Sequence, residues 1–367
     1  MNEIRQETAK QYQRLKIISF FLNFFAATTF LFLLVSLRAA HKLRDTVTAN
    51  VPDFWLQVLT YATVLGFFTY LLEFPFSLWK GYFLEKRYAL STLNIRGWCI
   101  RELKKALFSL FFFLLLVETG YALVRTIGEN WWIAFGTLWF MYSWVLVQIF
   151  PVFIVPLFFR YTPVEDETLV QLLKTFARSQ DRDIDSVKVL NLSKETKKAN
   201  AAVLGLGKKK KIVLGDTLLR HFDHEEIKVV FAHELGHDKE HHVLVSLFFN
   251  AAVTFVGIYG VQKLLVRFFP FFQLTHLDDL AALPLFLSLF SVYGFVLMPI
   301  QNGFSRILEH RADIFALRTT GLKDVFISAM KKLAESNLAD ESPSKLTEIF
   351  FYSHPPISKR IELARKC

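Results

Sequence analysis

Six long apolar runs constrain the fold of this chain more than any other feature. Each run is close to the roughly 20 residues that an α-helix needs to cross the hydrocarbon core of a bilayer. Of the 367 residues, 53% are hydrophobic and 40 are Phe, which is far more apolar than a soluble domain usually is. The sequence therefore predicts a mostly α-helical, polytopic membrane protein with about six transmembrane helices. The runs occupy residues 17–37, 54–78, 106–124, 131–159, 243–265 and 281–300.

The charged residues lie mainly in the segments that flank these runs. A net charge of +10 can indicate a nucleic-acid ligand, but cations beside transmembrane helices follow the positive-inside pattern without one. We therefore expect membrane lipids and no nucleic acid among the partners. The densest group of cations lies between the second and third runs and predicts a cytoplasmic loop there. Its members are Lys80, Lys86, Arg87, Arg96, Arg101, Lys104 and Lys105.

The same pattern places the polar N-terminus, residues 1–16, on the cytoplasmic side. The turn at 128–130 and the loop with Asp278 and Asp279 lack an excess of cations and are expected outside. A small group of cations contradicts this topology: Lys42, Arg44, Lys263 and Arg267. Within the second and third runs, Glu73 lies near a helix end where it can reach the headgroups, and the role of Glu118 stays open.

Four parts follow from the runs. Residues 1–159 form a membrane region with four transmembrane helices, 160–242 a soluble insert, 243–300 a transmembrane hairpin and 301–367 a C-terminal helical part. In the insert, residues 165–178 have the pattern of an amphipathic helix, and the runs at 187–190, 201–204 and 212–214 are typical of strands. Lys208 to Lys211 are expected in a solvated turn near anionic headgroups.

The motif His233-Glu234-Leu235-Gly236-His237 ends the insert. Apolar residues around it recur at helical spacing, so the two histidines share one helix face about one turn apart. Neutral imidazoles are common zinc ligands, and Glu234 is placed to take a proton from metal-bound water. The alternative is a chance H-E-x-x-H on an amphipathic helix, and a third ligand would argue against it.

Glu309 is the candidate for that third ligand. It lies four residues before Asp313 on a second predicted helix, and we assign Asp313 to a hydrogen bond that fixes a ligand imidazole. The alternative is a solvated charged face. The hairpin 243–300 returns the chain to the side that it left, which places the site at the membrane boundary. For His241 and His242, metal ligation is not expected.

Two further features, the strand at 201–204 and His354, each fit a functional role or an ordinary structural one on pattern alone. A strand beginning at Asn200-Ala201 would suit an exposed sheet edge that binds an extended peptide by main-chain hydrogen bonds, although it could equally be an ordinary hairpin strand. His354 precedes Pro355 and Pro356, which hold it outside a helix. Such a histidine is more often a loop residue than a catalytic one.

Taken together, these stretches resemble the integral-membrane zinc CAAX prenyl proteases, in their bacterial form. The similarity runs from about the second apolar run to the C-terminus. The residues that carry it are Asn200-Ala201 with Gly205, Ile212 to Leu219, His233 to His237, Ser305-Arg306 with Glu309, Ala312-Asp313, and Ser353 to Pro356 with Arg360; Pro75, Glu85 and Leu90 to Thr92 match more weakly.

The resemblance implies a small α+β, gluzincin-like zinc-peptidase domain and one Zn²⁺ per chain, held by His233, His237 and Glu309. It implies that Glu234 is the catalytic base, that His354 acts near the scissile carbonyl with support from Arg360, and that Asn200 and Ala201 bind substrate. It also implies a peptide or protein substrate with or without a prenyl group, and a bacterial inner membrane with the termini and the zinc site on the cytoplasmic side. Eukaryotic members resemble a seven-span barrel that encloses a chamber, whereas six spans are predicted here.

Three alternatives follow from the same residues. A non-enzymatic scaffold could use zinc only to tie two helices together, with a fourth ligand from His310, Asp313 or His354. A general quality-control protease of the membrane would have no prenyl preference. A protease that cuts within transmembrane segments would carry H-E-x-x-H inside an apolar run, whereas charged residues at 223–228 and 238–240 flank this motif.

Overall fold

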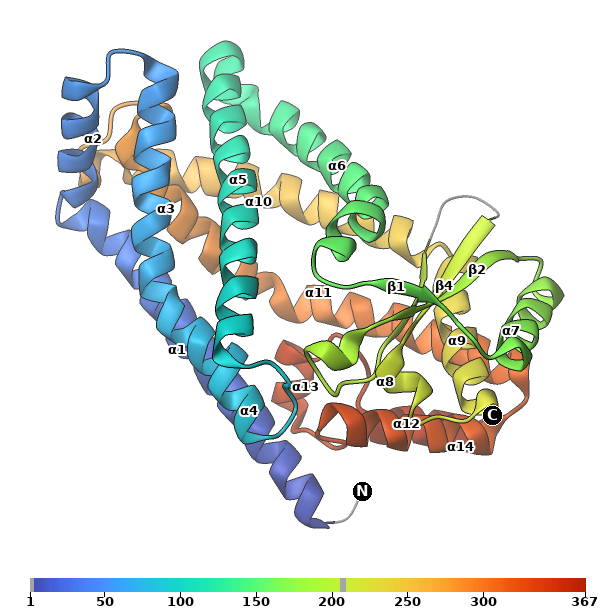
Figure 1. Ribbon diagram of the computed structural model, residues 1–367. Helices are drawn as coiled ribbons and strands as arrows, with labels where there is room; N and C mark the ends of the chain where they lie inside the picture. The colour runs from blue at the N-terminus through green and yellow to red at the C-terminus, as the bar shows by residue number, and fades with distance from the viewer. Residues whose placement is uncertain (1–2, 205–208) are drawn as a thin grey trace.

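The computed structural model describes residues 3–204 and 209–367, and Figure 1 shows long helices packed beside a smaller part with a sheet and shorter helices. The helices are α1 Glu3–Ser36, α2 Ala39–Asn50, α3 Phe54–Leu78, α4 Glu85–Arg87, α5 Ile95–Ile127, α6 Trp131–Ile149, α7 Glu167–Ser179, α8 Asp216–Leu219, α9 His224–Lys239, α10 His242–Phe272, α11 Leu283–Thr320, α12 Lys323–Asn337, α13 Lys345–Phe351 and α14 Ile357–Lys366. The strands are β1 Tyr161–Pro163, β2 Asp183–Leu190, β3 Ala201–Leu204 and β4 Lys209–Gly215.

Five helical stretches of the described chain are long and apolar enough to cross a membrane. They are 3–36, 54–87, 95–157, 242–272 and 280–320. The third stretch is divided by the turn Gly128–Asn130 into α5 and α6, which turn back on each other (Figure 1). The count is therefore close to the six helices that the apolar runs predict.

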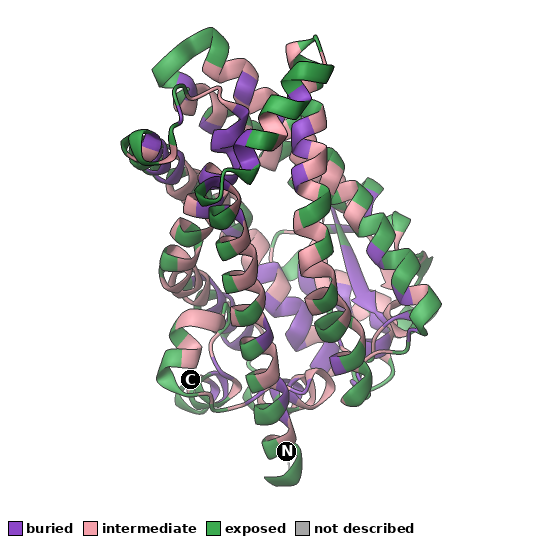
Figure 2. Cartoon of the chain, turned by 90° about the vertical axis from the view of Figure 1, so that its left-hand side faces the viewer, coloured by how far each residue is buried: buried purple, intermediate pink, exposed green. Residues whose placement is uncertain are grey.

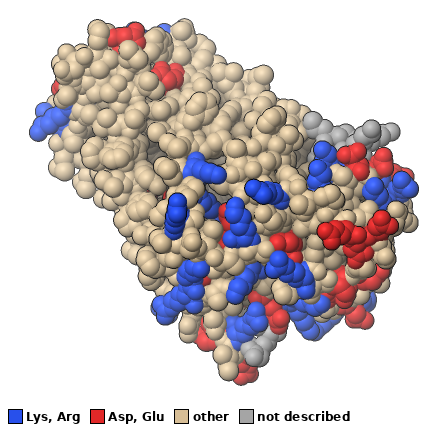
Figure 3. All heavy atoms as spheres, in the orientation of Figure 1, with Lys and Arg blue, Asp and Glu red and all other residues tan. Residues whose placement is uncertain are grey.

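The surface separates an apolar half from a charged half. In Figure 2 the long helices are largely half-buried or exposed, and their exposed residues include Phe25, Phe111 and Phe248. Figure 3 shows that Lys, Arg, Asp and Glu gather over the part with the sheet and the shorter helices and over the adjoining ends of the long helices, whereas few lie on the far ends of the long helices. Large exposed apolar side chains of this number are stable in contact with lipid rather than with water.

The basic segment after α3 differs from the expected loop. A π-helical segment, Trp79–Leu84, continues α3 into α4, and α5 begins at Ile95, so most of the cations project from helices. Asn94 stabilises the start of α5, because its side chain accepts a hydrogen bond from the Gly97 amide. The loop is reduced to residues 88–94.

The sheet has the strand order β1-β2-β4-β3. β2 and β4 are parallel, and β1 and β3 pair antiparallel at the two edges. The expectation of a solvated turn for the lysine run is wrong for Lys210 and Lys211, which lie in β4; Lys210 is buried and its Nζ is 2.6 Å from Asp238 Oδ1. Lys208 lies outside the described residues.

One face of the sheet packs against helices from both ends of the insert and from the C-terminus. The buried side chains of α9 include Phe231 and Leu235, which are at most 1% exposed, and Phe326 of α12 joins the same core. Burying a large apolar side chain contributes about 1.5–3 kcal/mol. This core fixes α9, the helix that carries the H-E-x-x-H motif, beneath the sheet.

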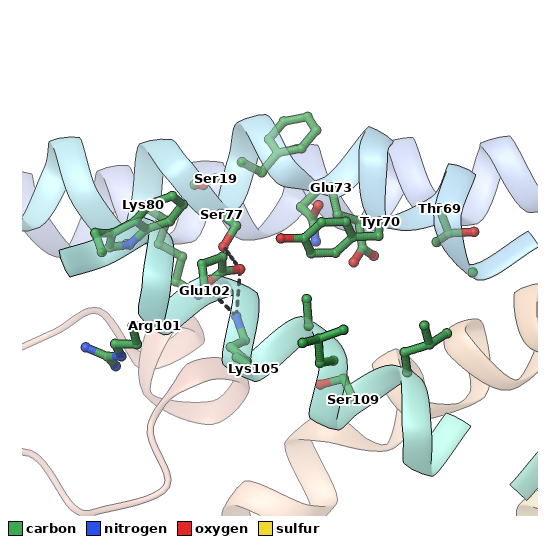
Figure 4. Close-up of a pocket in the computed structure, with 18 of the residues that line it drawn as sticks. Ser19, Thr69, Tyr70, Glu73, Ser77, Lys80, Arg101, Glu102, Lys105 and Ser109 are labelled. Atoms are coloured by element: carbon green, nitrogen blue, oxygen red, sulfur yellow. Dashed lines mark hydrogen bonds and ion pairs between the residues drawn. The ribbon is translucent and has the colours of Figure 1, made fainter. Parts of the chain in front are cut away.

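A cavity of about 1030 Å³ separates α1, α3 and α5. Its polar lining comes from residues at helical spacing, including Thr69, Glu73 and Ser77 of α3, which face Glu102 and Lys105 of α5 in Figure 4. Ser77 donates to Glu102 at 2.6 Å, and Lys105 lies 3.2 Å from the same carboxylate. Glu73 therefore lines an internal cavity instead of extending along the outer surface.

Candidate metal centre

Helix α9 begins with a capping box. The Asp223 carboxylate accepts from the Glu226 amide at 2.9 Å, and the Glu226 carboxylate accepts from the Asp223 amide at 3.0 Å. Glu226 is 2% exposed and also binds Ser328 and Lys332 of α12. The start of α9 is thus fixed to its neighbour, which orients the histidines two to three turns further on.

His233 and His237 of α9 meet Glu309 of α11. The two Nε2 atoms lie 3.2 Å apart, and Glu309 places Oε2 3.2 Å from His233 Nε2 and Oε1 3.5 Å from His237 Nε2. Among the described residues, these three form the group of potential ligands whose donor atoms lie within 4.8 Å of one another. Two stretches 72 residues apart in the sequence therefore converge on one point.

The donor atoms fit a metal ion. Glu309 is 7% exposed, and its Oε2 is buried and makes no hydrogen bond, although His233 Nε2 lies 3.2 Å away. A buried carboxylate oxygen without a partner is costly unless a cation compensates it. Two imidazoles and one carboxylate are the donor set of catalytic zinc sites of the His₂Glu type.

The other nitrogen of His233 has a buried partner, as the sequence predicts for Asp313. Nδ1 of His233 lies 2.8 Å from Asp313 Oδ1, and Arg360 of α14 donates to both oxygens of Asp313, with Nε at 2.8 Å from Oδ2. Asp313 is fully buried, so Arg360 supplies the charge that its carboxylate needs. Burial lowers the pKa of His233, but its interactions with the carboxylates of Asp313 and Glu309 outweigh this and raise it to about 9.

The other nitrogen of His237 has a partner that the sequence does not reveal. His242 Nδ1 lies 2.8 Å from His237 Nδ1, and His242 Nε2 lies 3.2 Å from Glu240 Oε2. Arg311 of α11 binds the same Glu240 oxygen at 2.6 Å. His242 is 2% exposed. His242 follows His237 by five residues. In one continuous helix that spacing would turn its side chain away from the ligand face, but α9 ends at Lys239 and α10 begins at His242, so the chain changes direction between the two histidines.

Glu234 lines a cavity of about 1100 Å³ together with His237 and Glu309. Burial raises the pKa of its carboxyl, although His233 and His237 oppose this. A carboxylate with a raised pKa is a better proton acceptor than a solvated one. The structure thus brings the predicted base to the same cavity as two of the predicted ligands.

His354 lies in the turn between α13 and α14, with Nε2 3.3 Å from Glu309 Oε1. Arg306, one turn before Glu309, holds this turn, because its guanidinium donates to the carbonyls of Glu348 and Tyr352. Burial lowers the pKa of His354. The sequence pattern left His354 as a loop residue, and the contacts place it beside the candidate metal ligands.

β3 is an edge strand, as expected. Gly215 donates to the Asn200 carbonyl at 2.8 Å, and Ala201 faces Leu214 in the antiparallel pair. Hydrogen-bonded and non-bonded pairs alternate along such a ladder. The backbone groups of Ala201 and Val203 therefore point away from β4, toward the open edge, and Val203 lines the cavity with Glu234.

Two family models match the chain end to end. The model described as peptidase family M48 matches residues 163–367, and the one described as CAAX prenyl protease N-terminal, five membrane helices, matches residues 1–160. The second description agrees with a helical membrane region before the sheet.

Individual proteins are similar over nearly the whole chain. The uncharacterized metalloprotease YhfN of Bacillus subtilis is 32% identical, over 98% of this chain and 85% of that protein. The CAAX prenyl protease 1 homolog of Arabidopsis thaliana is 29% identical, over 83% of this chain and 73% of that protein. The crystal structure of Ste24p of S. mikatae superposes with a TM-score of 0.84 at 22% identity, covering 99% of this chain and 89% of that one, which shows a shared fold.

Proposed function

The chain belongs to peptidase family M48, and from this premise we propose that His233, His237 and Glu309 hold one zinc ion for peptide-bond hydrolysis. The protein is a multi-pass integral membrane metalloprotease that acts on peptides or proteins. The observation that carries the assignment of the site is the convergence of three donor groups around a buried Glu309 oxygen that lacks a hydrogen-bond partner.

Glu234 would carry out both proton transfers of the reaction. When bound, zinc supplies a Lewis acid that polarises the peptide carbonyl and acidifies water. Glu234 accepts a proton from the attacking water and passes it to the nitrogen of the leaving amine. Its burial supports this role, because a raised pKa makes the carboxylate a stronger base toward the proton of the attacking water.

The surrounding residues would orient the ligands and the substrate. Asp313 and Arg360 hold the His233 ring, and His242 holds the His237 ring. His354 would donate a hydrogen bond to the carbonyl oxygen as negative charge develops there. Its distance of 3.3 Å from Glu309 supports a position within reach of the reacting groups.

An extended peptide would bind along β3, with Asn200 and Ala201 at its start. The outward backbone groups of Val203 and the outward carbonyl of Ala201 support this mode, because β-strand addition needs free donors and acceptors at a sheet edge. The Ala201 amide already donates to Asn200 Oδ1 at 2.9 Å. The cations of α4 and the start of α5 support a cytoplasmic position for this end of the molecule, and the bacterial source of the 32% identical relative supports a bacterial membrane.

The alternatives are not favoured. A structural zinc site needs a fourth protein ligand. Asp313 is engaged by His233 and Arg360, and His310 is exposed. His354, with Nε2 3.3 Å from Glu309 Oε1, is the remaining candidate, and cleavage by the zinc-loaded protein separates a closed structural site from a catalytic one. For a cut within a transmembrane segment, the motif would sit inside an apolar helix, whereas α9 lies under the sheet with Asp223 at its start.

The proposal is tested with the purified full chain in detergent. Its metal content is quantified, and matched prenylated and unprenylated peptides are incubated with three samples of the protein. The first is the protein as purified, the second contains a chelator, and the third has zinc added back after chelation. We expect one zinc per chain and cleavage that the chelator abolishes. Faster cleavage of the prenylated peptides would indicate a protease that recognises the lipid, equal rates a general membrane protease, and no cleavage by the zinc-loaded protein would contradict the proposal.

A further inference from the structure

The cavity that contains Glu234, His237 and Glu309 has two unlike walls. The end of α6 and the start of α10 form an apolar wall that includes Trp144, Val147 and Leu247. A second part of the lining comes from the sheet face that carries Lys188 of β2 and Lys211 of β4, which is opposite the face with Ile212 and Leu214 that packs on α9. A substrate that fills this cavity contacts both an apolar and a basic surface.

The basic wall has an excess of cations. Four line the cavity: Arg182, Lys188, Lys210 and Lys211. Outside the candidate metal site, the one carboxylate among the lining residues is Asp238, and it binds both Arg182 and Lys210 at 2.6 Å. Neither Lys188 nor Lys211 has a carboxylate partner within the described part of the chain.

The two unmatched lysines share one face of the sheet. Lys188 pairs with Val213 in the parallel ladder, and Lys211 precedes Val213 by two residues in β4. Side chains two apart in a strand, and those of paired residues, point to the same face. The positions of the two lysines are therefore set by the register of the sheet, and they are fixed relative to β3 in the same sheet.

We propose that this wall binds a carboxylate of the peptide substrate. The inference rests on the proposed peptidase function and narrows its substrate class to peptides that carry a negative charge on the part that occupies this cavity. A peptide carries carboxylates at its C-terminus and on Asp and Glu side chains, and both are complementary to the ammonium groups of Lys188 and Lys211. The nearby apolar wall reduces screening by water, which strengthens such pairs.

The test measures binding separately from cleavage. The full chain with the substitution Glu234→Gln is loaded with zinc, and the affinities of matched peptides are compared by fluorescence anisotropy. One pair differs in a free or amidated C-terminus, and a second pair carries Glu or Gln within the sequence. We expect at least one charged form to bind about three- to tenfold more tightly, in the range of partly exposed ion pairs, and the difference to shrink at high salt.

Variants assign the effect to the two lysines. Lys188→Gln combined with Lys211→Gln should bring the charged and neutral peptides to equal affinity. The double substitution to Arg keeps both charges and should retain the preference. A matched control, Lys174→Gln with Lys194→Gln, removes two cations that do not line the cavity and should leave the preference unchanged.

Two outcomes would overturn the proposal. One is equal affinity for the charged and neutral peptides in the protein with both lysines, and the other is a preference that survives the loss of both lysines. Neither of these outcomes affects cleavage by the unsubstituted protein. The failure of the charge preference is therefore distinguishable from the failure of the peptidase function.

Discussion

At the scale of single residues, His242 gives the most informative prediction. Its Nδ1 lies 2.8 Å from His237 Nδ1. When His237 binds a metal through Nε2, its Nδ1 carries the proton, and His242 is the acceptor that holds the ring in place. We expect His242→Ala to weaken zinc binding about 10–100-fold, the usual effect of losing such a partner, and His242→Gln, which keeps an acceptor, to restore part of it. Competition with a chromophoric chelator measures the affinity.

A neighbouring substitution controls for the change in sequence. His241 is exposed and has a φ of 55°, a left-handed conformation that Asn tolerates. His241→Asn should therefore bind zinc as the parent protein does. Unchanged zinc affinity in His242→Ala would show that His237 needs no partner.

The residues of the candidate site differ in how visible they are from sequence. His233, His237, Glu309 and Asp313 are visible, because spacings of four place each pair on one helix face. His242 is hidden, because the break between α9 and α10 redirects its side chain and local periodicity contains no signal of that break. The ion pair between Lys210 and Asp238 could not be predicted from local sequence either. Lys210 is placed by β4, and β4 forms by pairing with β2, whose paired residues lie more than 20 residues earlier in the chain.

At the scale of elements, the contact of α9 with α11 depends on Gly236. A Cβ there would lie 3.2 Å from both Ala312 Cα and Phe315 Cβ, so the two helices approach closely at the level of the ligands. We expect Gly236→Val to separate them, to lower stability by about 1–3 kcal/mol and to weaken zinc binding. Thermal unfolding in detergent and zinc titration measure the two effects.

Gly260 of α10 provides the control. Nothing lies within 4 Å of a Cβ at this position, so Gly260→Ala should leave zinc affinity unchanged, and a small gain in helix propensity is expected. Equal zinc affinity in Gly236→Val and the parent protein would refute the role of the close approach.

The edge strand gives a second prediction at this scale. The Val203 amide points away from β4, so Val203→Pro removes a donor from the open edge without removing one from the ladder. We expect the fold and zinc content to be retained and peptide affinity to fall. Ala202→Pro, which removes a ladder donor, should instead destabilise the sheet. Peptide binding that is unaffected by Val203→Pro would contradict binding along β3.

At the scale of the whole molecule, the metal site closes a loop that includes the hairpin of α10 and α11. A ligand that binds only the folded state stabilises it by about 4 kcal/mol at a concentration 1,000 times its Kd. We expect chelation to lower the midpoint of thermal unfolding and Glu309→Ala to remove this dependence on zinc. A midpoint that does not respond to zinc in the parent protein would argue against a site that joins α9 to α11.

The apolar runs predict the number and order of the membrane helices well, because the length needed to cross a bilayer is a local property of the sequence. Where each helix begins is less predictable. The cations just before the third apolar run are typical of a loop, yet they lie in the first turns of α5, because Asn94 caps that helix ten residues upstream of Lys104. The two cavities depend on how distant helices and strands pack, and no local pattern contains that information.

The most direct test of the account is the zinc content of three purified proteins, the parent chain, Glu234→Gln and Glu309→Ala. The account predicts one zinc per chain in the first two and little or none in Glu309→Ala, because Glu234 is assigned to proton transfer and Glu309 to the metal. A Glu309→Ala protein that retains a full complement of zinc would contradict it.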